Sequence, residues 1–413
     1  MVTGLSGSEI LKVAAEIRAV RETGVDVCDL TVGDFGPKQF RIPAALRTGI
    51  EAALDRGETN YPPSAGMPVL RESVRALYAD RLGVEYPVSS ILITSGSRPG
   101  IYGTYLTLVD PGDRVVYSVP SWNNNHYCHL VGGRDVVVAC DASTNFLPTR
   151  AMLESAVRGA RMLVLNSPLN PTGTMFSEEQ LAGICDLVVE ENARRQGERP
   201  LYLLYDQVYW TLTLGSERHV HPVALNAAMA PYTIYVDGIS KAFAATGVRV
   251  GWVAGPADVM ARMGDVLTHI GTWAPRAGQV ATAALLADRD ATDAANREIV
   301  SGLRERTGAL AKGLAAMRAD GLPVDVIEPQ GAIYVCARFA LTGRRGADGA
   351  VLSTNEEIRR YLLQRAALGV VAFQAFGLRE ESGWFRLSAG AVSVAEIEAV
   401  MPRVRAAIEQ TIS

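Results

Sequence analysis

One lysine stands where its amine could do chemistry. Lys241 follows directly on an apolar run, Ile239 and Phe243 flank it, and no other lysine lies in this stretch. Arg249 comes eight residues later, beside glycines. Burial among apolar neighbours lowers the pKa of a lysine, so that its amine becomes a nucleophile able to form a Schiff base with a carbonyl. Most lysines are solvated surface charges, but this setting predicts a reactive one.

Two other motifs carry polar side chains at the ends of predicted strands. Asp206 and Tyr209 stand in the sequence Leu-Tyr-Asp-Gln-Val-Tyr, and Asn170 opens the sequence Asn-Pro-Thr-Gly. Open α/β sheets bind ligands at the carboxyl ends of their strands, which makes Asp206 a candidate ligand-binding carboxylate. Each motif also has a purely structural interpretation, a strand-end cap for Asp206 and a turn for the asparagine motif.

A turn rich in small residues links a predicted strand to a helix at residues 94–100. The free amides at a helix N-terminus bind anions, and the positive end of the helix dipole adds to this attraction. We therefore predict a phosphate site at Gly96, Ser97 and Arg98. Arg249 would supply the positive charge. A lone Gly-x-x-x-Gly turn would be weak evidence for such a site.

Together these motifs resemble those of the class I and II aminotransferases, which are pyridoxal-phosphate enzymes of fold type I. The resemblance covers nearly the whole chain and rests on at least six separated motifs in the family's order. It implies that Lys241 holds the cofactor as a Schiff base, and that Asp206 keeps the pyridine nitrogen protonated so that the ring accepts electrons. Asn170 and Tyr209 are then expected to hydrogen-bond the 3′ oxygen of the cofactor, and Asn170 also to reach the substrate carboxylate.

The same resemblance assigns three further residues to the cofactor. Trp122 matches the aromatic residue that stacks on the cofactor ring and lines the substrate site. Tyr61 matches a tyrosine that reaches the phosphate in the neighbouring subunit, which implies a homodimer with shared active sites. Gly238 stands where the family often has a phosphate-binding serine, so Ser240 is the hydroxyl expected to take that role.

The resemblance also implies the substrates, an amino acid and a 2-oxo acid. Gly33 and Arg386 match residues that contact the amino acid, and the planar guanidinium of Arg386 is suited to its α-carboxylate. Residues 123–128 and Arg98 resemble the bacterial aspartate aminotransferase branch, so aspartate with 2-oxoglutarate is the expected pair. A dicarboxylic amino acid needs a second cation, for which Arg98 and Arg276 are both candidates.

The elements that position these residues alternate between strands and helices from about residue 90 to 255. Helices are expected from Pro99 to about residue 108 and, opened by a capping box at Ser177 and Gln180, to about residue 195. Strands without in/out alternation are typical of a parallel sheet buried on both faces. We therefore expect an α/β fold with a mainly parallel seven-stranded sheet and helices on both faces, and the resemblance implies fold type I. The predicted strands are residues 90–94, 114–119, 135–140, 161–166, 201–206, 232–237 and 248–254.

The pattern changes after about residue 275, where we expect a smaller α/β domain. Residues 342–349 are rich in glycine and charge, and they predict a flexible loop. The expected elements are a long helix through 303–317, strands at 324–327, 333–336, 370–371 and 384–387, and helices beginning near 354 and 394. The expected division is an N-terminal arm with part of the small domain (1–45), a large cofactor-binding domain (46–285) and a small C-terminal domain (286–413).

Composition narrows the class of protein. The 413-residue chain is 48% hydrophobic with a net charge of −4, which excludes disorder and argues against a nucleic-acid partner. No apolar run reaches the ~18 residues of a membrane span, and the charged N-terminus does not resemble a signal peptide. Five dispersed cysteines indicate a reduced, cytoplasmic protein. His126, Cys128 and His129 lack a second ligand pair, so we expect no metal site.

Two other functions stay open at this point. The fold type I scaffold also supports lyases, decarboxylases and cyclases, and steady amine transfer to a 2-oxo acid would separate an aminotransferase from them. The second alternative is a cofactor-binding regulator without turnover. Such proteins carry a DNA-binding domain ahead of the fold, and no basic extension of that kind precedes it here.

Overall fold

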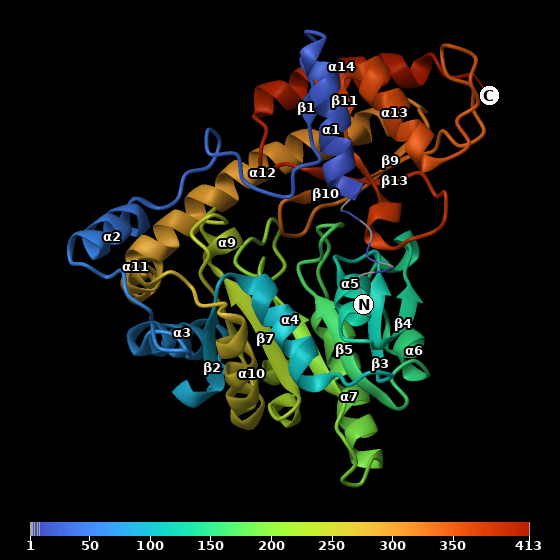
Figure 1. Cartoon of the computed structure of the whole chain (residues 1–413). Coiled ribbons are helices and arrows are strands. Elements are labelled where there is room, and N and C mark those ends of the chain that lie inside the picture. Colours follow the sequence, from blue (N-terminus) through green and yellow to red (C-terminus); the bar gives the residue numbers. More distant parts are fainter. Residues whose placement is uncertain (1–2, 4, 6, 8, 413) are drawn as a thin grey trace.

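The computed structural model describes residues 3, 5, 7 and 9–412 and is built around a seven-stranded sheet (Figure 1). The strand order is β2-β8-β7-β6-β5-β3-β4. β8 runs antiparallel to β2 and β7, and the other neighbours are parallel. This confirms the mainly parallel sheet expected from the sequence. Its strands are β2 (Ile91–Thr94), β3 (Arg114–Val119), β4 (Arg134–Ala139), β5 (Ala160–Asn166), β6 (Tyr202–Asp206), β7 (Thr233–Gly238) and β8 (Gly251–Ala254).

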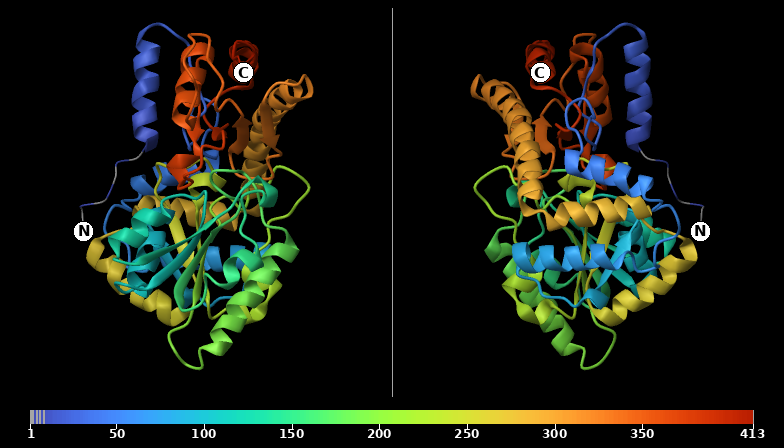
Figure 2. Two further views of the ribbon diagram at one scale, coloured as in Figure 1. Left: turned by 90° about the vertical axis from the view of Figure 1, so that its right-hand side faces the viewer. Right: turned by 90° about the vertical axis from the view of Figure 1, so that its left-hand side faces the viewer.

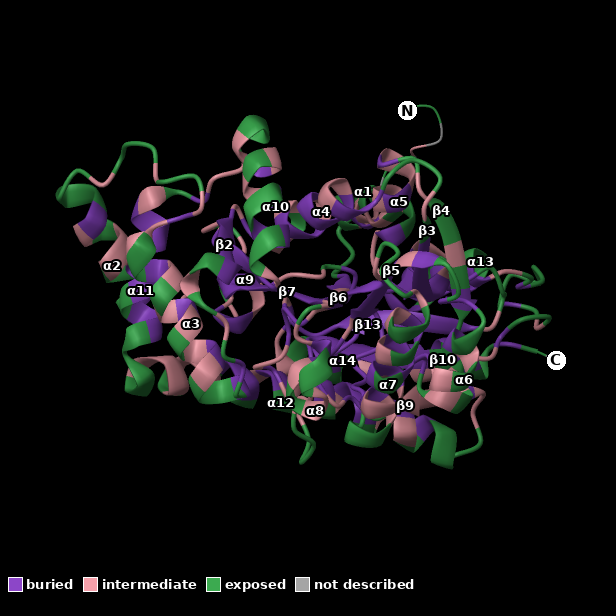
Figure 3. Cartoon of the chain, turned by 90° about the horizontal axis from the view of Figure 1, so that it is seen from below, coloured by how far each residue is buried: buried purple, intermediate pink, exposed green. Residues whose placement is uncertain are grey.

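The parallel strands bring several polar residues to one edge of this sheet. β5, β6 and β7 are parallel neighbours, so their carboxyl ends, at Asn166, Asp206 and Gly238, meet at the same edge. Helices lie on both faces of the sheet (Figure 2), and every strand except the edge strand β4 is buried along most of its length (Figure 3). Burial on both faces is the reason that the strand sequences lack a polar alternation.

The starts of the longer helices follow signals in the sequence. Ser177 and Gln180 form the expected capping box of α7, and α4 begins at Ser97 with Pro99 in its first turn. The helices around the large sheet are α2 (Ala44–Asp55), α3 (Pro68–Leu82), α4 (Ser97–Leu108), α5 (Asn124–Leu130), α6 (Arg150–Glu154), α7 (Glu178–Arg194), α8 (Pro222–Leu225), α9 (Ile239–Ala242), α10 (Ala257–Ile270) and α11 (Arg276–Ala287).

A second group of elements lies above the carboxyl edge of the large sheet in Figure 1. It contains an antiparallel sheet in the order β12-β13-β10-β9 and a parallel pair, β1 with β11. Val13 and Ile17 of the N-terminal helix pack against Leu363 and Ala367, so the two ends of the chain share a core. The elements are α1 (Glu9–Glu22), β1 (Cys28–Asp29), α12 (Arg289–Ala319), β9 (Val324–Ile327), β10 (Tyr334–Phe339), α13 (Asn355–Ala366), β11 (Leu368–Gly369), β12 (Val371–Ala372), β13 (Trp384–Ser388) and α14 (Val394–Glu409).

Two of these elements are longer than the sequence pattern predicts. α12 runs for 31 residues, because the side chain of Asp288 caps it well before the apolar stripe at 303–317 begins. β10 continues to Phe339, because its residues pair with β13 on one side and β9 on the other. Within the described residues, no helix combines the length and the low polarity needed to cross a membrane.

Candidate active site

The turn that carries Lys241 closes tightly on a neighbouring strand. Lys241 lies in α9, the short helix that follows β7, and Gly238 joins the two elements. A Cβ atom at Gly238 would lie 2.7 Å from the Cα of Gly251 in β8. A serine at 238 would therefore push these backbones apart, so only glycine fits this close approach. Ser240 remains the hydroxyl of this turn, and it is buried.

The amine of Lys241 is buried beside the N-terminal segment of the chain. Its Nζ donates a hydrogen bond to the carbonyl of Gly33 at 2.7 Å and lies 3.8 Å from the Asp34 carboxylate. Burial lowers the pKa of Lys241 to about 8, although the charge of Asp34 acts in the opposite direction. A much larger fraction of this amine is neutral near pH 7 than of an ordinary lysine, as a nucleophile and base requires.

Asp206 supplies a carboxyl group that lacks a cationic partner within the described residues. It ends β6, and its Oδ1 accepts a hydrogen bond from the backbone N–H of Val208 at 3.3 Å. Burial raises its pKa to about 7. A carboxyl group in this state would be held ionised by a cation placed beside it, so the site fits the protonated ring nitrogen of pyridoxal phosphate.

An anion cradle lies between the first turn of α4 and Arg249. Gly96 has a φ of 84°, and a Cβ atom there would lie 2.2 Å from Nη2 of Arg249. The guanidinium is held by the carbonyls of Thr246 at 2.7 Å and Ser95 at 2.8 Å. The first N–H groups of α4, from Ser97, have no partner within the helix. A phosphate dianion fits this combination of amides and fixed positive charge.

Arg386 is a buried cation whose partners are neutral. Its Nη1 donates to Oδ1 of Asn170 at 3.2 Å and its Nη2 donates to the carbonyl of Thr31 at 2.7 Å. The guanidinium lies between the rings of Tyr334, at 4.8 Å, and Phe376, at 4.9 Å. Its Nε has no hydrogen-bond partner among the described residues, and the side chain is only 1% exposed. A buried, incompletely bonded guanidinium is suited to a carboxylate ligand.

The remaining predicted residues divide into two groups. The guanidinium of Arg98 lies 5.4 Å above the ring of Trp122, and its charge affects the pKa of Lys241, so it belongs to the same site. The ring of Tyr61 is 80% exposed and packs edge-on against Trp273 at 5.1 Å. Arg276 forms an ion pair with Glu58. A single subunit therefore does not assemble all the predicted residues around Lys241.

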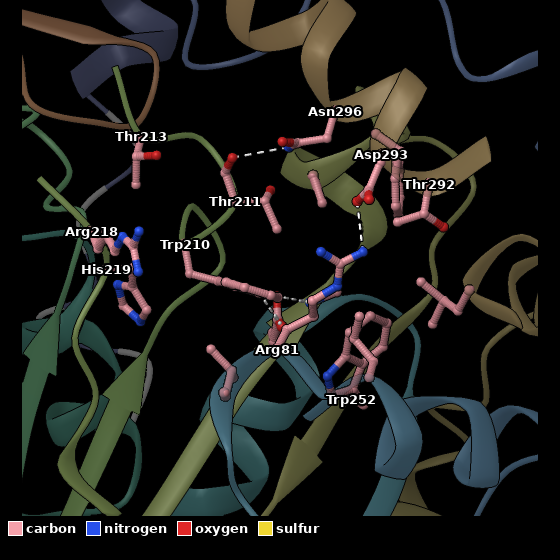
Figure 4. A pocket seen from close by; sticks show the side chains of 17 residues that line it. Arg81, Trp210, Thr211, Thr213, Arg218, His219, Trp252, Thr292, Asp293 and Asn296 are labelled. Carbon is pink, nitrogen blue, oxygen red and sulfur yellow. Dashed lines mark hydrogen bonds and ion pairs between the residues drawn. The ribbon is translucent and has the colours of Figure 1, made fainter. Parts of the chain in front are cut away.

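A cavity of about 310 Å³ is lined in part by the turn that carries Lys241, at Gly238, Ala242 and Phe243 (Figure 4). Asp237 and Gly238 form part of its lining, and the side chain of Arg81 points across it to Asp293 at 2.7 Å. Asp237 accepts a hydrogen bond from the indole of Trp210 at 2.8 Å, and burial raises its pKa to about 8. Within the described chain, neither Lys241 nor Asp206 reaches this cavity, so its network supports the turn from behind.

Two side chains of the site, Asp34 and Tyr334, were not predicted from the sequence. The second carboxylate oxygen of Asp34 accepts a hydrogen bond from the Thr246 hydroxyl at 3.1 Å. In the sequence, the only indication of its role is that it directly follows Gly33. Tyr334 hydrogen-bonds the hydroxyl of Tyr209 at 2.7 Å. Tyr334 lies in an ordinary apolar strand sequence, which carries no sign of this contact. The described residues contain no group of three or more His, Cys, Asp or Glu placed to hold a metal ion.

Known proteins match nearly the whole chain. A family model described as aminotransferase class I and II matches residues 25–404. An aspartate aminotransferase of Rhizobium meliloti is 30% identical over 99% of this chain and 95% of its own length. A crystal structure of the aspartate aminotransferase from Rhizobium meliloti has a TM-score of 0.91 at 28% identity, covering 100% of this chain and 98% of that one. An aromatic aminotransferase from Pyrococcus horikoshii has a TM-score of 0.82 at 28% identity, covering 95% and 98%.

Proposed function

The chain belongs to the class I and II aminotransferases, enzymes that use pyridoxal phosphate, and we propose that it transfers the amino group of aspartate to a 2-oxo acid such as 2-oxoglutarate. The observation that carries the proposal is the arrangement of Lys241, Arg386 and Arg98. The charges of both arginines act on the amine of Lys241, and Arg386 is buried with only neutral partners. A substrate with an amino group and two carboxylates has the matching charges.

We assign the cofactor to the residues around Lys241 and the anion cradle. When bound, it draws electron density from the α-carbon of the amino acid and makes the α-proton acidic. Asp206 would face the ring nitrogen, Tyr209 and Asn170 the ring oxygen, and Trp122 the ring face. The proposed phosphate contacts within the subunit are the turn at Gly96, Ser97 and Arg98, together with Ser240 and Arg249. Tyr61 of the partner subunit would add one further contact.

The chain's own groups then bind the substrate and move its proton. Arg386 would hold the α-carboxylate with the planar donors of its guanidinium. Asn170 would bond both the ring oxygen of the cofactor and this carboxylate, and the two contacts together would fix the amino acid relative to Lys241. The Nζ of Lys241 would accept the proton from the α-carbon of the donor and deliver it to C4′ of the cofactor, and it would move a proton in the opposite direction when the 2-oxo acid is converted. Its pKa of about 8 suits both directions of transfer near neutral pH. Gly33, whose carbonyl accepts from Nζ at 2.7 Å, would keep the amine in place.

The proposed reaction is tested with the purified holoenzyme, aspartate and 2-oxoglutarate. We expect oxaloacetate and glutamate in equal amounts and parallel double-reciprocal plots, because the first product leaves before the second substrate binds. A screen of the standard amino acids would show whether aspartate is the best donor. Release of carbon dioxide or ammonia without glutamate formation would instead establish lyase or decarboxylase chemistry, and a preference for neutral side chains would reject aspartate.

We propose that Arg98, rather than Arg276, binds the distal carboxylate, because Arg276 is already paired with Glu58. Arg98→Ala keeps the backbone amide at the phosphate turn but removes the guanidinium. We expect kcat/KM for aspartate to fall by about 10- to 100-fold, the effect of losing a charge-assisted hydrogen bond, with alanine changed by less than about threefold.

The matched variant for this experiment is Arg276→Ala. This variant should lower kcat/KM for aspartate and for alanine by the same factor, since it breaks a structural ion pair. The reverse result, a loss selective for aspartate in Arg276→Ala and none in Arg98→Ala, would assign the distal carboxylate to Arg276.

We also propose a homodimer in which Tyr61 acts in the active site of the partner subunit. Tyr61 is 80% exposed although its ring packs against Trp273. This exposure of a large aromatic side chain supports a contact outside its own subunit. Mixing inactive Lys241→Ala with inactive Tyr61→Ala should restore at most about a quarter of the wild-type activity, because about half of the dimers are mixed and each has one intact site. The assay is turnover after subunit exchange, verified with differently tagged subunits. An absence of recovery after verified exchange would place Tyr61 outside a shared site.

A further inference from the structure

We propose that Tyr334 is a positioning residue for the cofactor: its hydroxyl donates a hydrogen bond to the hydroxyl of Tyr209, which leaves the proton of Tyr209 directed at the ring oxygen of the cofactor. The inference rests on the proposed function, since it takes Tyr209 as a contact of that oxygen. It adds Tyr334 of β10 to Arg386 of β13 as a second residue that the smaller sheet contributes to the site.

The two tyrosines come from separate parts of the fold and meet in a buried contact. Their hydroxyl oxygens are 2.7 Å apart, and their rings pack edge-on with centroids 5.7 Å apart. Both side chains are almost fully buried, Tyr334 at 1% and Tyr209 at 4% exposure. Tyr334 begins β10, and Tyr209 follows the end of β6. Burial removes competing water, so this hydrogen bond stays intact and orients both hydroxyls.

The space for the Tyr334 hydroxyl depends on a glycine of the substrate site. A Cβ atom at Gly33 would lie 3.1 Å from the hydroxyl oxygen of Tyr334 and 3.3 Å from Nη1 of Arg386. The carbonyl of Gly33 in turn accepts the hydrogen bond of Lys241. The Tyr334 hydroxyl therefore lies among the groups proposed to hold the cofactor and the amino acid.

Only one proton can lie between the two oxygens, and the charge of Arg386 decides which tyrosine supplies it. The guanidinium lies 4.8 Å from the centre of the Tyr334 ring. Burial raises the pKa of Tyr334, but the charge of Arg386 counteracts this effect. Burial and then the neighbouring Tyr334 raise the pKa of Tyr209 well above its usual range, and the charge of Arg386 opposes this shift as well. The guanidinium packs on the ring of Tyr334, so it stabilises negative charge most directly on that phenol and makes Tyr334 the better donor.

This direction leaves the proton of Tyr209 for the cofactor. If Tyr209 donated to Tyr334 instead, its lone pairs would face the cofactor oxygen and repel it. A donated proton favours the form of the cofactor in which that oxygen is negative. Tyr334 should therefore lower the pH at which the visible spectrum of the holoenzyme changes, through Tyr209 and without touching the cofactor.

The test is a pH titration of the visible absorbance of the holoenzyme and three variants. Tyr334→Phe keeps the ring and removes the hydroxyl, and we expect the spectral midpoint to rise by about 0.5–1 pH unit, the effect of one hydrogen bond. Tyr209→Phe should raise it further, and the double variant should match Tyr209→Phe alone, because Tyr334 acts only through Tyr209. The control is Tyr232→Phe. Tyr232 directly precedes β7, at the end away from the Lys241 turn, so its replacement should leave the spectral midpoint unchanged.

Each other outcome overturns a defined part of the proposal. An unmoved midpoint in Tyr334→Phe with a raised KM for the amino acid would make Tyr334 a direct substrate contact. Shifts that add in the double variant would show that the two hydroxyls act independently. A wild-type protein that takes up no pyridoxal phosphate would overturn the proposed function and this inference together, whereas a normal wild-type spectrum with no shift in Tyr334→Phe overturns only the inference. Unchanged thermal unfolding of the variants would confirm that they are folded.

Discussion

Replacement of Lys241 by alanine is expected to abolish amino-group transfer while the protein still binds its cofactor. The variant loses the group that moves the α-proton, and loss of a general base at the upper end of its usual range lowers the rate by about 10⁴-fold. Covalent attachment to the cofactor is lost in addition, so the total effect should be larger. Steady-state turnover of aspartate and 2-oxoglutarate measures the rate, and absorbance after gel filtration measures retained cofactor.

Binding should survive because the other proposed contacts stay in place. Asp206, Arg249 and the turn at Gly96 are held by contacts that do not involve the lysine side chain. The matched control is Lys312→Ala, which removes an exposed lysine on α12 and should keep wild-type turnover. Near-normal transamination by the Lys241 variant would reject the assignment of this lysine.

Asp206→Asn should have the second-largest effect on the rate. Asparagine has nearly the same shape but cannot hold a protonated ring nitrogen by charge. Removing one member of a buried charge pair costs ~3–5 kcal/mol, which corresponds to a rate loss of roughly 10²- to 10⁴-fold when the pair is needed in the transition state. Turnover number under saturating cofactor is the measurement. A loss of less than about tenfold would show that another group keeps the ring protonated.

Asp237→Asn separates this effect from the loss of any buried carboxylate. Asp237 belongs to the neighbouring strand, β7, and accepts hydrogen bonds from Trp210 and from the Gly238 N–H. We expect it to lower thermal stability with less than about tenfold loss in turnover, because it lies behind the lysine turn. An equal fall in turnover for both variants would mean that buried charge as such, and not the cofactor contact, determines the rate.

The carboxyl group of Asp206 is also expected to make the stability of the cofactor-free protein depend on pH. Burial raises the pKa of Asp206 in the folded state to about 7, above its value in the unfolded chain. Folding therefore favours the protonated form, and stability contributed by this group is lost as pH rises from about 4 to about 7. Denaturant unfolding at pH 5 and pH 8 should show Asp206→Asn gaining stability relative to the wild type at the higher pH. Bound cofactor should cancel the gain, because it supplies the missing cation.

Local patterns were sufficient to determine the elements and the order of the catalytic motifs. Ser177 and Gln180 predict the start of α7 because a capping box involves residues only three positions apart. The strands around Lys241 and Asp206 follow from unbroken apolar runs, since a sheet covered on both faces excludes polar alternation. Parallel strands then bring their ends to one edge, so the place of the proposed site also follows from the sequence.

The partners of the site residues depended on packing between distant segments. The carbonyl of Gly33 meets Lys241 across 208 positions of the chain, and Tyr209 meets Tyr334 across 125. Both contacts form because the smaller sheet and the N-terminal segment close over the carboxyl edge of the larger sheet. Periodicity and capping report only on residues within a few turns of each other, so no local signal could reveal these contacts. Tertiary structure alone decided which charges and hydroxyls surround the lysine.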